Sequence, residues 1–591
     1  MRTLLTHLWK HISRKRRIQL GILFCVMLVA SFAELFSVGM VIPFLGVLTT
    51  PELMYEHWFV RPVVVHLGLK NPQDLLLPTT LTFGVAVILA AIIRFYLVWL
   101  QARVSMGIVT EMAVETYWRT LHQPYAFHIA RNSSEIISSI LNKVGGGIGA
   151  TIGPLLVLIS SALITVTILV ALILFNPVVA LSSFLGFCTV YTIIVFLTKK
   201  RLARDSLKIS QASNEVIKVL QEGLGGIRDI LLDGTQTTYC STYRNADVEL
   251  RNAQASIQII SSAPKFVIES LGIVVIAVIA YSFSTKPGGV VTVIPLLGAL
   301  AVGAQKLLPL LQQAYSSWVL ILGAREPLRD VLDLLDHAPP EISDDKQHRS
   351  EIVYKREIRL EHISFRYTPQ SPCVLRDICL TLPKGGRIGF IGTTGSGKST
   401  LLDILMGLLQ PTAGSLVIDE VVLTAANQRA WQARIAHVPQ AIFLSDGTIA
   451  ENIAFGLPRD EVDLERVKAA ARQAQISGAI ESWREQYDTL VGERGVRLSG
   501  GQRQRIGIAR ALYKQADVII FDEATSALDN ETERAVMQAI DGLGDHLTIL
   551  IVAHRLTTLR NCTQIVELQN GELKQIGSYA GIIEKSGQLG A

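Results

Sequence analysis

The sequence predicts an α-helical membrane domain with six spans, followed by an α/β domain built around a phosphate-binding loop. Three observations predict this fold class. Long apolar runs fill the chain up to about Leu335, a polar stretch with Pro339 and Pro340 comes next, and a glycine-rich loop between a strand and a helix follows at Gly392. We therefore place the membrane domain at residues 1–335, a linker at 336–350 and the α/β domain at 351–591.

The composition excludes several classes of protein. Of the 591 residues, 49% are hydrophobic and 18% are charged, and the mean hydropathy is +0.38. Soluble chains carry about 25% charged residues, so a purely soluble protein is disfavoured. The apolar content excludes disorder, and six scattered cysteines show neither metal-ligand spacing nor a disulfide framework. The net charge of +5 is modest, and we expect no nucleic-acid partner.

Six apolar segments reach the roughly 20 residues that a membrane helix needs. They run from about Ile18 to Leu48, from Leu81 past Leu100, from Gly145 to Phe175, from Pro177 to Leu197, from Phe266 to Phe283, and from Val290 to Leu322. The alternative, buried helices of a soluble protein, does not account for runs of this length. An uncleaved first span is favoured over a signal peptide, because its apolar run exceeds the usual 7–15-residue core.

Basic residues predict the orientation of the spans. The segment Met1–Arg17 has six lysines and arginines and no acid, and a second basic group follows the fourth span at Lys199–Lys208. By the positive-inside rule, the N-terminus and the α/β domain are cytoplasmic, and the loop Pro51–Leu77 is outside. The segments Gln101–Asn142 and Thr198–Pro264 are then cytoplasmic, and their helical pattern predicts helices of about 30 Å or more.

The glycine-rich segment at Gly392 predicts a phosphate site. It follows the apolar strand Arg387–Ile391 and opens a helix, and it reads Gly392, Thr393, Thr394, Gly395, Ser396, Gly397, Lys398, Ser399 and then Thr400. In such a loop the backbone N–H groups and the helix N-terminus bind phosphate, the lysine reaches the β- and γ-phosphates, and the serine hydroxyl ligates Mg²⁺. The strand–loop–helix context separates this segment from a chance match.

Two later strands end in residues that suit the same chemistry. Val518–Asp522 ends in a carboxylate that suits the Mg²⁺ shell, and Glu523 directly after it suits the base that polarises the attacking water. The strand Ile549–Val552 leads to His554, which we interpret as a γ-phosphate contact, with a helix-capping histidine as the alternative.

A second anion-binding device lies between these motifs. The segment after Leu498 reads Ser499, Gly500, Gly501 and Gln502, and a helical pattern begins at Arg503. A helix N-terminus preceded by small residues binds anions. One chain thus carries two half-sites for phosphate, the alternative for the second being a plain glycine turn.

With these motifs, the chain resembles the ATP-binding cassette (ABC) transporters, specifically half-size exporters with six spans. Leu498–Gln502 resembles the family's signature sequence, Val491–Gly495 an exporter loop, and Ser526–Asp529 the segment that crosses between paired cassettes. The resemblance implies an ABC ATPase of the P-loop NTPase fold with ATP and Mg²⁺ as cofactors. It further implies that Tyr367 stacks on adenine and that Gln440 links the nucleotide to the membrane domain. We expect Ser399, Gln440 and Asp522 to be the Mg²⁺ ligands.

The resemblance also implies partners and a mechanism. In the family each ATP lies between the phosphate loop of one cassette and the signature of another, so we expect a homodimer, with a heterodimer as the alternative. Closure of the cassettes would move the membrane halves through helix tips near His122–Ala130 and Gly223–Gly234, and hydrolysis at Glu523 would release them. A multi-pass protein of the bacterial inner membrane is favoured.

Three cations within the predicted spans indicate an anionic substrate. Arg94, Lys265 and Lys306 lie on three different spans, about 24–28 Å below the outer span ends at 1.5 Å per residue. Charges within spans are functional candidates. The alternative is snorkelling to the cytoplasmic surface, and Glu34 and Glu269 are possible counter-charges.

These cations and the outer loop resemble the lipid-linked oligosaccharide flippases, which engage a pyrophosphate with basic cavity residues. The loop is expected to form an interfacial amphipathic helix, or else a packed cap. We expect an ATP-driven flippase for a polyprenyl-pyrophosphate glycan. Other lipids, drugs or peptides remain alternative substrates, an ATP-gated channel or non-transporting regulator is the second class, and the spans exclude a soluble phosphate-loop enzyme.

Overall fold

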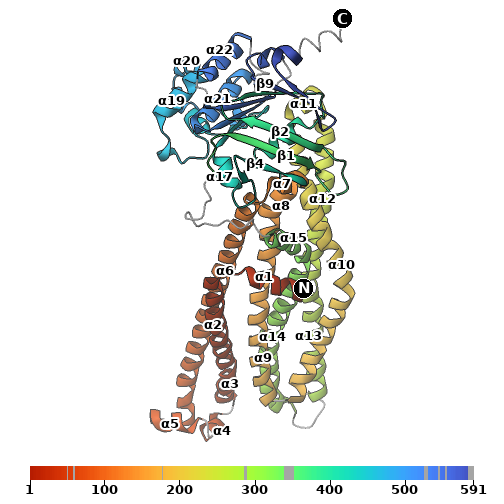
Figure 1. Cartoon of the computed structure of the whole chain (residues 1–591). Helices are drawn as coiled ribbons and strands as arrows, with labels where there is room; N and C mark the ends of the chain where they lie inside the picture. Colours follow the sequence, from red (N-terminus) through yellow and green to blue (C-terminus); the bar gives the residue numbers. More distant parts are fainter. Residues whose placement is uncertain are drawn as a thin grey trace. The chain divides into compact units, whose positions relative to one another are not determined.

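The computed structural model describes residues 1–49, 51–56, 60–175, 177–284, 289–337, 352–524, 530–542, 546–552 and 556–582. The chain divides into two compact units: residues 1–123 with 131–339, and residues 124–130 with 340–591. The predicted linker lies almost wholly outside the described residues, as do the turns at Asn176 and Lys286. The first unit is helical and the second contains β-sheets, as the sequence predicts (Figure 1).

The helices of the first unit include one for each predicted span. They are α1 (Arg2–His11), α2 (Arg14–Gly39), α3 (Val41–Thr49), α4 (Pro51–Tyr55), α5 (Arg61–Leu67), α6 (Leu76–Leu121), α8 (Ser133–Ser138), the π-helix η2 (Ser139–Gly149), α9 (Ala150–Phe175), α10 (Pro177–Gly225), α11 (Ile227–Leu232), α12 (Gln236–Ser262), α13 (Pro264–Ser284), α14 (Gly289–Gly323) and α15 (Arg325–Asp336).

Among the described residues, four helical segments are long and apolar enough to cross a membrane, or five if a bent pair counts as one span. The four are Arg14–Leu48, Pro72–Leu121, Ser133–Ile173 and Gln236–Val274. The predicted fourth and sixth spans fall within α10 and α14.

Two helices are much longer than a bilayer requires. Helix α6 has 46 residues and α10 has 49, which at 1.5 Å per residue gives about 70 Å each. The hydrocarbon core of a bilayer is only about 30 Å thick. Both helices are therefore longer than a single span needs, and their extension into the cytoplasm stays a prediction. The short helix α11 follows α10 in the segment expected to form a tip.

The long helices pack side by side through apolar stripes. Helix α2 contacts α6 and α9, α9 contacts α14, and α10 contacts α12 (Figure 1). Leu23 of α2, Ile108 of α6 and Ile148 of η2 are fully buried in one shared core cluster. Burial of each such side chain contributes about 1.5–3 kcal/mol relative to exposure.

The third predicted span begins as a π-helix, which the sequence did not predict, and its glycines allow close packing of a neighbouring helix. Helix η2 contains Gly145, Gly146 and Gly147, and a β-carbon on Gly147 would lie 2.7 Å from the backbone nitrogen of Leu328. The absent side chain lets α15 approach the backbone closely. Lys143 in the same segment is buried and donates to Asp330 of α15 at 2.5 Å, so the unusual helix and α15 are joined by packing and by charge.

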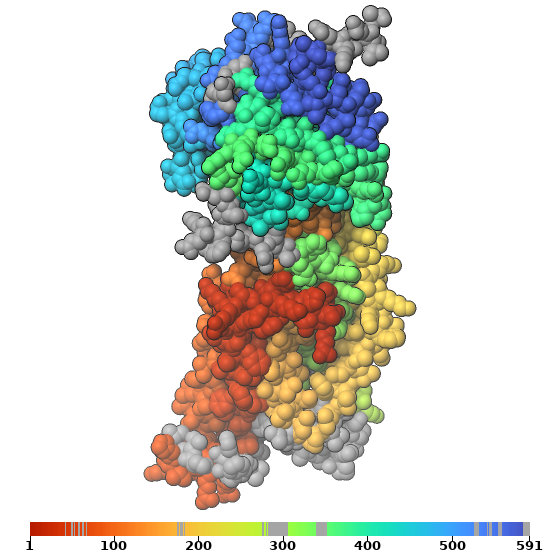
Figure 2. Space-filling view, in the orientation of Figure 1, coloured from red at the N-terminus to blue at the C-terminus, as the bar shows by residue number. Residues whose placement is uncertain are grey.

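The N-terminal helix lies across the other helices of this unit (red in Figure 2). Leu8 and Ile12 are buried against α15, and His11 Nε2 lies 2.9 Å from Asp336 Oδ1. Ser13 then caps α2 by accepting a hydrogen bond from the backbone of Arg16. The N-terminal segment thus contributes to the packed core of the unit.

The segment between α3 and α6 folds as a small packed cap. It contains α4, α5 and the short 3₁₀ helix η1 (Pro72–Leu75), and these bury Val47, Val60 and Leu75 together. Tyr55 Oη donates to the Leu69 carbonyl at 2.7 Å. Of the two alternatives expected from the sequence, the structure shows the packed cap and not the interfacial amphipathic helix, because the apolar residues find partners within the loop itself.

The second unit consists of two sheets and their helices. The strands are β1 (Glu357–Phe365), β2 (Leu375–Pro383), β3 (Arg387–Ile391), β4 (Ala413–Ile418), β5 (Val421–Val422), β6 (Ile435–Val438), β7 (Val518–Asp522), β8 (Thr548–Val552), β9 (Gln564–Gln569) and β10 (Glu572–Gly577). The helices are α7 (Tyr125–Ala130), α16 (Lys398–Leu405), α17 (Gln428–Ala433), α18 (Ile449–Ile453), α19 (Leu464–Gln473), α20 (Ser477–Glu481), α21 (Gly500–Lys514) and α22 (Asn530–Asp541).

The larger sheet determines where the candidate site lies. Its order is β10-β9-β3-β8-β7-β6, and the strands from β9 to β6 run parallel. The smaller sheet, β2-β1-β4-β5, is antiparallel. Trp431 is fully buried near α16, and its indole N–H donates to the Leu405 carbonyl at 2.8 Å. Parallel strands bring the loops after their carboxyl ends to one edge, where ligands bind in open α/β sheets.

Candidate nucleotide and substrate sites

The phosphate loop follows β3 and its glycines have conformations that other residues adopt poorly. Gly392, Gly395 and Gly397 have φ values of +149°, +81° and +97°. A β-carbon on Gly392 would also lie 2.2 Å from the Leu568 carbonyl oxygen. Glycine is thus required both for backbone conformation and for close approach, and the loop leaves the N-terminus of α16 open to a ligand.

Lys398 lies at the start of α16 with its ammonium group folded over the loop. Nζ donates to the carbonyls of Gly392 at 2.8 Å and Thr393 at 3.0 Å. The predicted ligand Ser399 is exposed beside it, and Ser396 is buried with an unpaired hydroxyl. The cation is therefore held at the loop, where an incoming phosphate can replace two neutral carbonyls as its partner.

Asp522, at the end of β7, interacts with this lysine and with two further acids, Glu523 and Asp403. Burial raises the pKa of Asp522 above its usual value, the charge of Glu523 raises it further, and Lys398 lowers it. Burial, with a smaller contribution from Asp522, raises the pKa of Asp403 to about 6. Acids that resist ionisation in a cleft are typical of functional sites, and this group is placed to accept a cation.

The loop after β6 contacts the residue after β7. Gln440 Nε2 donates to Glu523 Oε2 at 2.6 Å, and the backbone N–H of Glu523 donates to the Val552 carbonyl of β8. Glu523 has φ +52°, a left-handed conformation that costs a non-glycine residue about 1–2 kcal/mol. Strain of this kind clusters at functional positions.

Tyr367 lies beside the first turn of α16. Its hydroxyl lies 3.0 Å from Thr400 Oγ1, and the residue is 47% exposed. Its ring packs edge-on against the ring of Phe365, with 5.0 Å between the ring centroids. An exposed aromatic ring that is held at one end offers a flat surface for a planar ligand. In the same unit, burial raises the pKa of Tyr125 of α7, and the charges of Asp403 and Tyr367 contribute, so α7 lies near this end of the site.

The second predicted half-site forms the N-terminus of α21. Ser499 Oγ accepts from the Gln502 N–H at 3.2 Å, and the Ser499 N–H donates to Gln502 Oε1 at 2.9 Å. This reciprocal pair is a capping box, which satisfies two of the N–H groups that a helix leaves unpaired at its start. The N–H groups of Gly500 and Gly501 come next in the chain. His554 and Ser526–Asp529 lie outside the described residues.

In the membrane unit, two of the three predicted cations share one counter-ion. Glu34 of α2 is 4% exposed, and its Oε1 lies 2.6 Å from Lys306 Nζ of α14 and 3.9 Å from Arg94 Nη1 of α6. Lys265 pairs instead with Glu269 of its own helix, at 3.8 Å. The structure thus brings Arg94 and Lys306 together through Glu34 and places Lys265 in a separate ion pair.

Sequence reasoning missed one functional candidate. Asp403 carries no motif signal, and only its burial beside Asp522 distinguishes it. Glu34 is expected from the sequence as a possible counter-charge, and the structure confirms this pairing and makes Glu34 the buried centre of the cluster. Its position within an apolar span was the one signal that the sequence offered.

Known proteins match both units. The chain matches the ABC transporter model over residues 375–526 and the ABC transporter transmembrane region over residues 19–296. An ATP-dependent lipid A-core flippase of Chromohalobacter salexigens is 30% identical over 535 residues, which cover 89% of this chain and 90% of that protein. A flippase of the same name from Ralstonia nicotianae is 28% identical over 516 residues, covering 85% and 84%.

A solved structure agrees with the fold. A bacterial Atm1-family ABC exporter with ATP bound superposes with a TM-score of 0.78 and covers 96% of both chains, at 21% identity. The phosphate loop, the capped signature helix and the helical unit occur in one chain with a single cassette. The chain therefore belongs to the ABC transporter family, as a half-transporter whose ATPase domain couples ATP hydrolysis to transport across the membrane.

Proposed function

We propose that this protein is an ATP-driven flippase that moves an anionic lipid outward, and that a polyprenyl-pyrophosphate-linked glycan is its substrate. The observation that carries the proposal is the cluster of Glu34, Arg94 and Lys306. Two cations from two helices meet one carboxylate from a third. The cluster therefore has a surplus of one positive charge within apolar helices, where unpaired charge is costly.

The exposure of the side chains favours an anionic ligand. The side chains of Arg94 and Lys306 are 37% and 35% exposed, whereas that of Glu34 is 5% exposed. The two cations are thus accessible in the isolated chain, whereas their counter-ion is buried. A phosphate or pyrophosphate group would complete the charge balance, with arginine as a bidentate donor and lysine as a point charge. Lys265 pairs with Glu269 of its own helix at 3.8 Å, and in this proposal Lys265 exchanges that partner for the same headgroup.

The ATPase domain supplies the energy. We assign phosphate binding to the loop Gly392–Ser399 with Thr400, adenine stacking to Tyr367, and γ-phosphate contact to His554. Glu523 is the base that polarises the attacking water, in a position held by Gln440. The hydroxyl, amide and carboxylate oxygens of Ser399, Gln440 and Asp522 are the hard ligands that Mg²⁺ prefers, and Mg²⁺ would neutralise phosphate charge there.

A second copy of the chain is the proposed partner. The capping box keeps Ser499–Gln502 at the N-terminus of α21. Backbone N–H groups at a helix N-terminus bind anions, so this segment suits a phosphate of the ATP that is bound to the phosphate loop of the other cassette. ATP held between two cassettes binds the closed dimer more tightly than the open one, and this difference in affinity shifts the membrane helices between inward- and outward-facing states. We place the protein in the bacterial inner membrane with the N-terminus and ATPase domain in the cytoplasm.

A second candidate substrate is a lipid A-core glycolipid. Relatives of 28–30% identity over most of this chain are ATP-dependent lipid A-core flippases. The same cation cluster suits any anionic glycolipid headgroup, so the choice between the two substrates needs a direct measurement.

The test is flipping in proteoliposomes, with a polyprenyl-pyrophosphate oligosaccharide in one arm and a lipid A-core glycolipid in the other. The variants are Glu523→Gln, Arg94→Ala and Lys306→Ala, and Lys70→Ala is the control, because it removes an exposed positive charge in the loop between α5 and α6, outside the cluster. We expect flipping to need Glu523 and to fall at least ~10-fold in both cluster variants while basal ATPase activity stays. Flipping of the lipid A-core glycolipid alone would refute the polyprenyl-pyrophosphate substrate in favour of the glycolipid. ATPase activity without flipping of either lipid would refute the proposal of a lipid substrate.

A further inference from the structure

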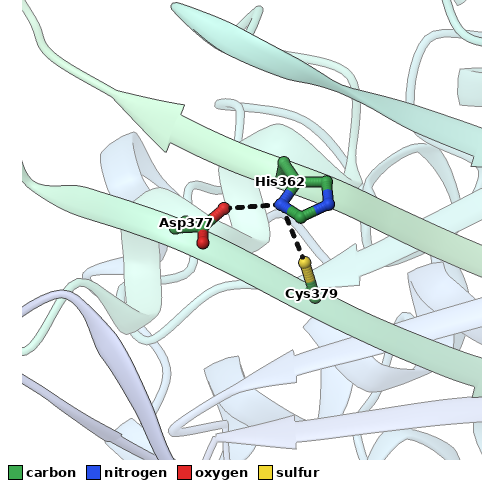
Figure 3. Close-up of side chains that lie close together, drawn as sticks. All are labelled: His362, Asp377 and Cys379. Carbon is green, nitrogen blue, oxygen red and sulfur yellow. Dashed lines mark hydrogen bonds and ion pairs between the residues drawn. The ribbon is translucent and has the colours of Figure 1, made fainter.

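Three side chains with metal-binding atoms meet on the surface of the smaller sheet of the ATPase domain. His362 belongs to β1, and Asp377 and Cys379 belong to β2. Both contacts converge on one ring nitrogen: His362 Nδ1 lies 2.7 Å from Asp377 Oδ1 and 3.5 Å from Cys379 Sγ (Figure 3). Their ligand atoms all lie within 4.8 Å of one another, and no other such group of three occurs in the described part of the chain.

We propose that His362, Asp377 and Cys379 form a surface site for one divalent cation of the zinc type. The site is independent of the nucleotide site and of the proposed lipid substrate. Imidazole nitrogen, thiolate sulfur and carboxylate oxygen are the three ligand types of Zn²⁺ sites. Mg²⁺ and Ca²⁺ require oxygen ligands, so the sulfur and nitrogen of this site select against them.

The separation of the nitrogen and sulfur ligand atoms fits tetrahedral coordination. Bond lengths of about 2.0 Å to nitrogen and 2.3 Å to sulfur place those two ligands about 3.5 Å apart around a tetrahedral ion. The observed separation of Nδ1 and Sγ is 3.5 Å. The histidine–aspartate contact of 2.7 Å has hydrogen-bond length and needs to open by only about half an ångström to admit the ion. A side-chain rotation suffices for such a shift.

The backbone aims these side chains through two β-bulges. The pairing of β1 with β2 shifts register between Leu360 and Ile363 and again between Ile363 and Phe365. His362 and Asp377 lie at these shifts with φ values of +53° and +50°. A bulge redirects a side chain relative to a regular strand, so the two shifts bring a β1 side chain beside two β2 side chains on the same face.

The bulges are held from both sides. The backbone N–H of Asp377 donates to Ser364 Oγ at 3.0 Å. On the other side of β1, Gly414 of β4 packs so closely that a β-carbon there would lie 2.3 Å from the His362 carbonyl oxygen. The ligands therefore stand on fixed backbone, which lowers the conformational cost of binding.

The exposure of the site determines its coordination. All three residues are exposed, so water is available as the fourth ligand. Three protein ligands and one exchangeable position describe an open site. An ion there would join β1 to β2, and its binding displaces the thiol proton of Cys379.

The experiment uses the purified full-length protein without nucleotide and titrates it with Co²⁺ and with Zn²⁺. Cobalt bound to a thiolate absorbs in the near ultraviolet, a signal that the acidic residues of the nucleotide site cannot give because they have no sulfur. We expect one Co²⁺ per chain with this absorption, and its displacement by Zn²⁺. The absorption should vanish in Cys379→Ser, and His362→Ala and Asp377→Asn should weaken binding at least ~10-fold.

Cys373→Ser is the matched control. Cys373 precedes the same strand, and its Sγ–H donates to the Leu375 carbonyl at 2.9 Å, away from the cluster. This variant should retain the cobalt signal, and Zn²⁺ should raise the thermal unfolding midpoint of wild type and Cys373→Ser but not of Cys379→Ser. Unchanged basal ATPase activity in Cys379→Ser would show that the variant is folded. Absence of the thiolate band in wild type, or its persistence in Cys379→Ser, would overturn the proposal.

Discussion

The side-chain amide of Gln440 donates to the carboxylate of Glu523 at 2.6 Å. The two residues are 83 positions apart, and they meet because β6 and β7 are adjacent parallel strands. A hydrogen bond to a charged acceptor contributes about 1.5–3 kcal/mol. The loop after β6 thus fixes the orientation of the carboxylate that we assign to hydrolysis.

Gln440→Ala should lower kcat for ATP hydrolysis at least ~10-fold and change the KM for ATP less than ~3-fold. The physical reason is that a freely rotating carboxylate no longer aligns the attacking water. Steady-state kinetics of the purified protein measure both constants. Gln432→Ala, which removes an amide bonded to the Gly407 carbonyl, should leave kcat unchanged. An equal loss in both variants would show that Gln440 acts only through stability.

The left-handed backbone conformation of Glu523 predicts that a glycine variant is more stable than an alanine variant at this position, the reverse of the usual order. Glu523→Gly and Glu523→Ala both remove the carboxylate, but alanine retains the steric strain and glycine does not. We expect the glycine variant to be more stable by about 1 kcal/mol, although glycine elsewhere costs 0.5–1 kcal/mol relative to alanine. Thermal unfolding of the two proteins compares them directly. A more stable alanine variant would mean that the backbone relaxes at this position.

Asp403 should make the ATPase domain less stable as the pH rises. Burial and Asp522 raise the pKa of Asp403 from 3.8 to about 6, so the folded state resists ionisation that the unfolded chain accepts. The penalty is absent below about pH 4, grows as the pH rises to about 6, and is complete above. Because Asp403 is partly accessible to solvent, we expect Asp403→Asn to stabilise the protein by about 1–3 kcal/mol at pH 7.5.

Unfolding midpoints of wild type and Asp403→Asn across pH 4 to 7.5 measure this effect. Their difference should shrink toward zero near pH 4. Asp460→Asn, at an exposed position, is the control for removal of a negative charge. A difference that stays constant with pH would exclude ionisation of Asp403 as its cause.

The ion cluster in the membrane unit predicts that Glu34 couples more strongly to Lys306 than to Arg94. Lys306 lies 2.6 Å from the buried Glu34 carboxylate and Arg94 lies 3.9 Å from it. Double-mutant cycles with Glu34→Gln, Lys306→Met and Arg94→Met should give about 1–3 kcal/mol for the lysine pair and less than about 1 kcal/mol for the arginine pair. Thermal unfolding in lipid nanodiscs measures both. Equal couplings would contradict the distances.

Ser499 allows stability and activity to be separated. Ser499→Ala loses the cap of α21 and should cost about 1 kcal/mol, whereas Ser499→Asp keeps a capping acceptor. If Ser499 also approaches a phosphate in the dimer, the aspartate variant should be stable yet lose most ATPase activity, because its charge repels the nucleotide. Thr448→Ala removes the matching cap of α18 and should lower stability alone. Full ATPase activity in Ser499→Asp would refute the phosphate contact.

Local patterns in the sequence determined much of this protein. The apolar runs determined the helical unit, because a membrane helix is recognised from length and hydropathy alone. The phosphate loop was predictable as far as its strand and helix, since its glycines meet local backbone requirements at Gly392 and Gly397. The π-helix at Ser139–Gly149 was not predicted, and the packed cap at Pro51–Leu75 was only one of two alternatives, because each depends on partners elsewhere in the unit.

The sequence by itself determined the two-part architecture and the chemistry of the phosphate loop, because both depend on residues that are neighbours in the chain. Only the tertiary structure decided which distant charges meet. It brought Gln440 to Glu523, placed Arg94 and Lys306 on Glu34 while Lys265 pairs within α13, and gathered His362, Asp377 and Cys379 on one sheet face. The physical reason is that an electrostatic contact depends on distance and burial in space, and these follow from helix packing and strand order rather than from spacing along the chain.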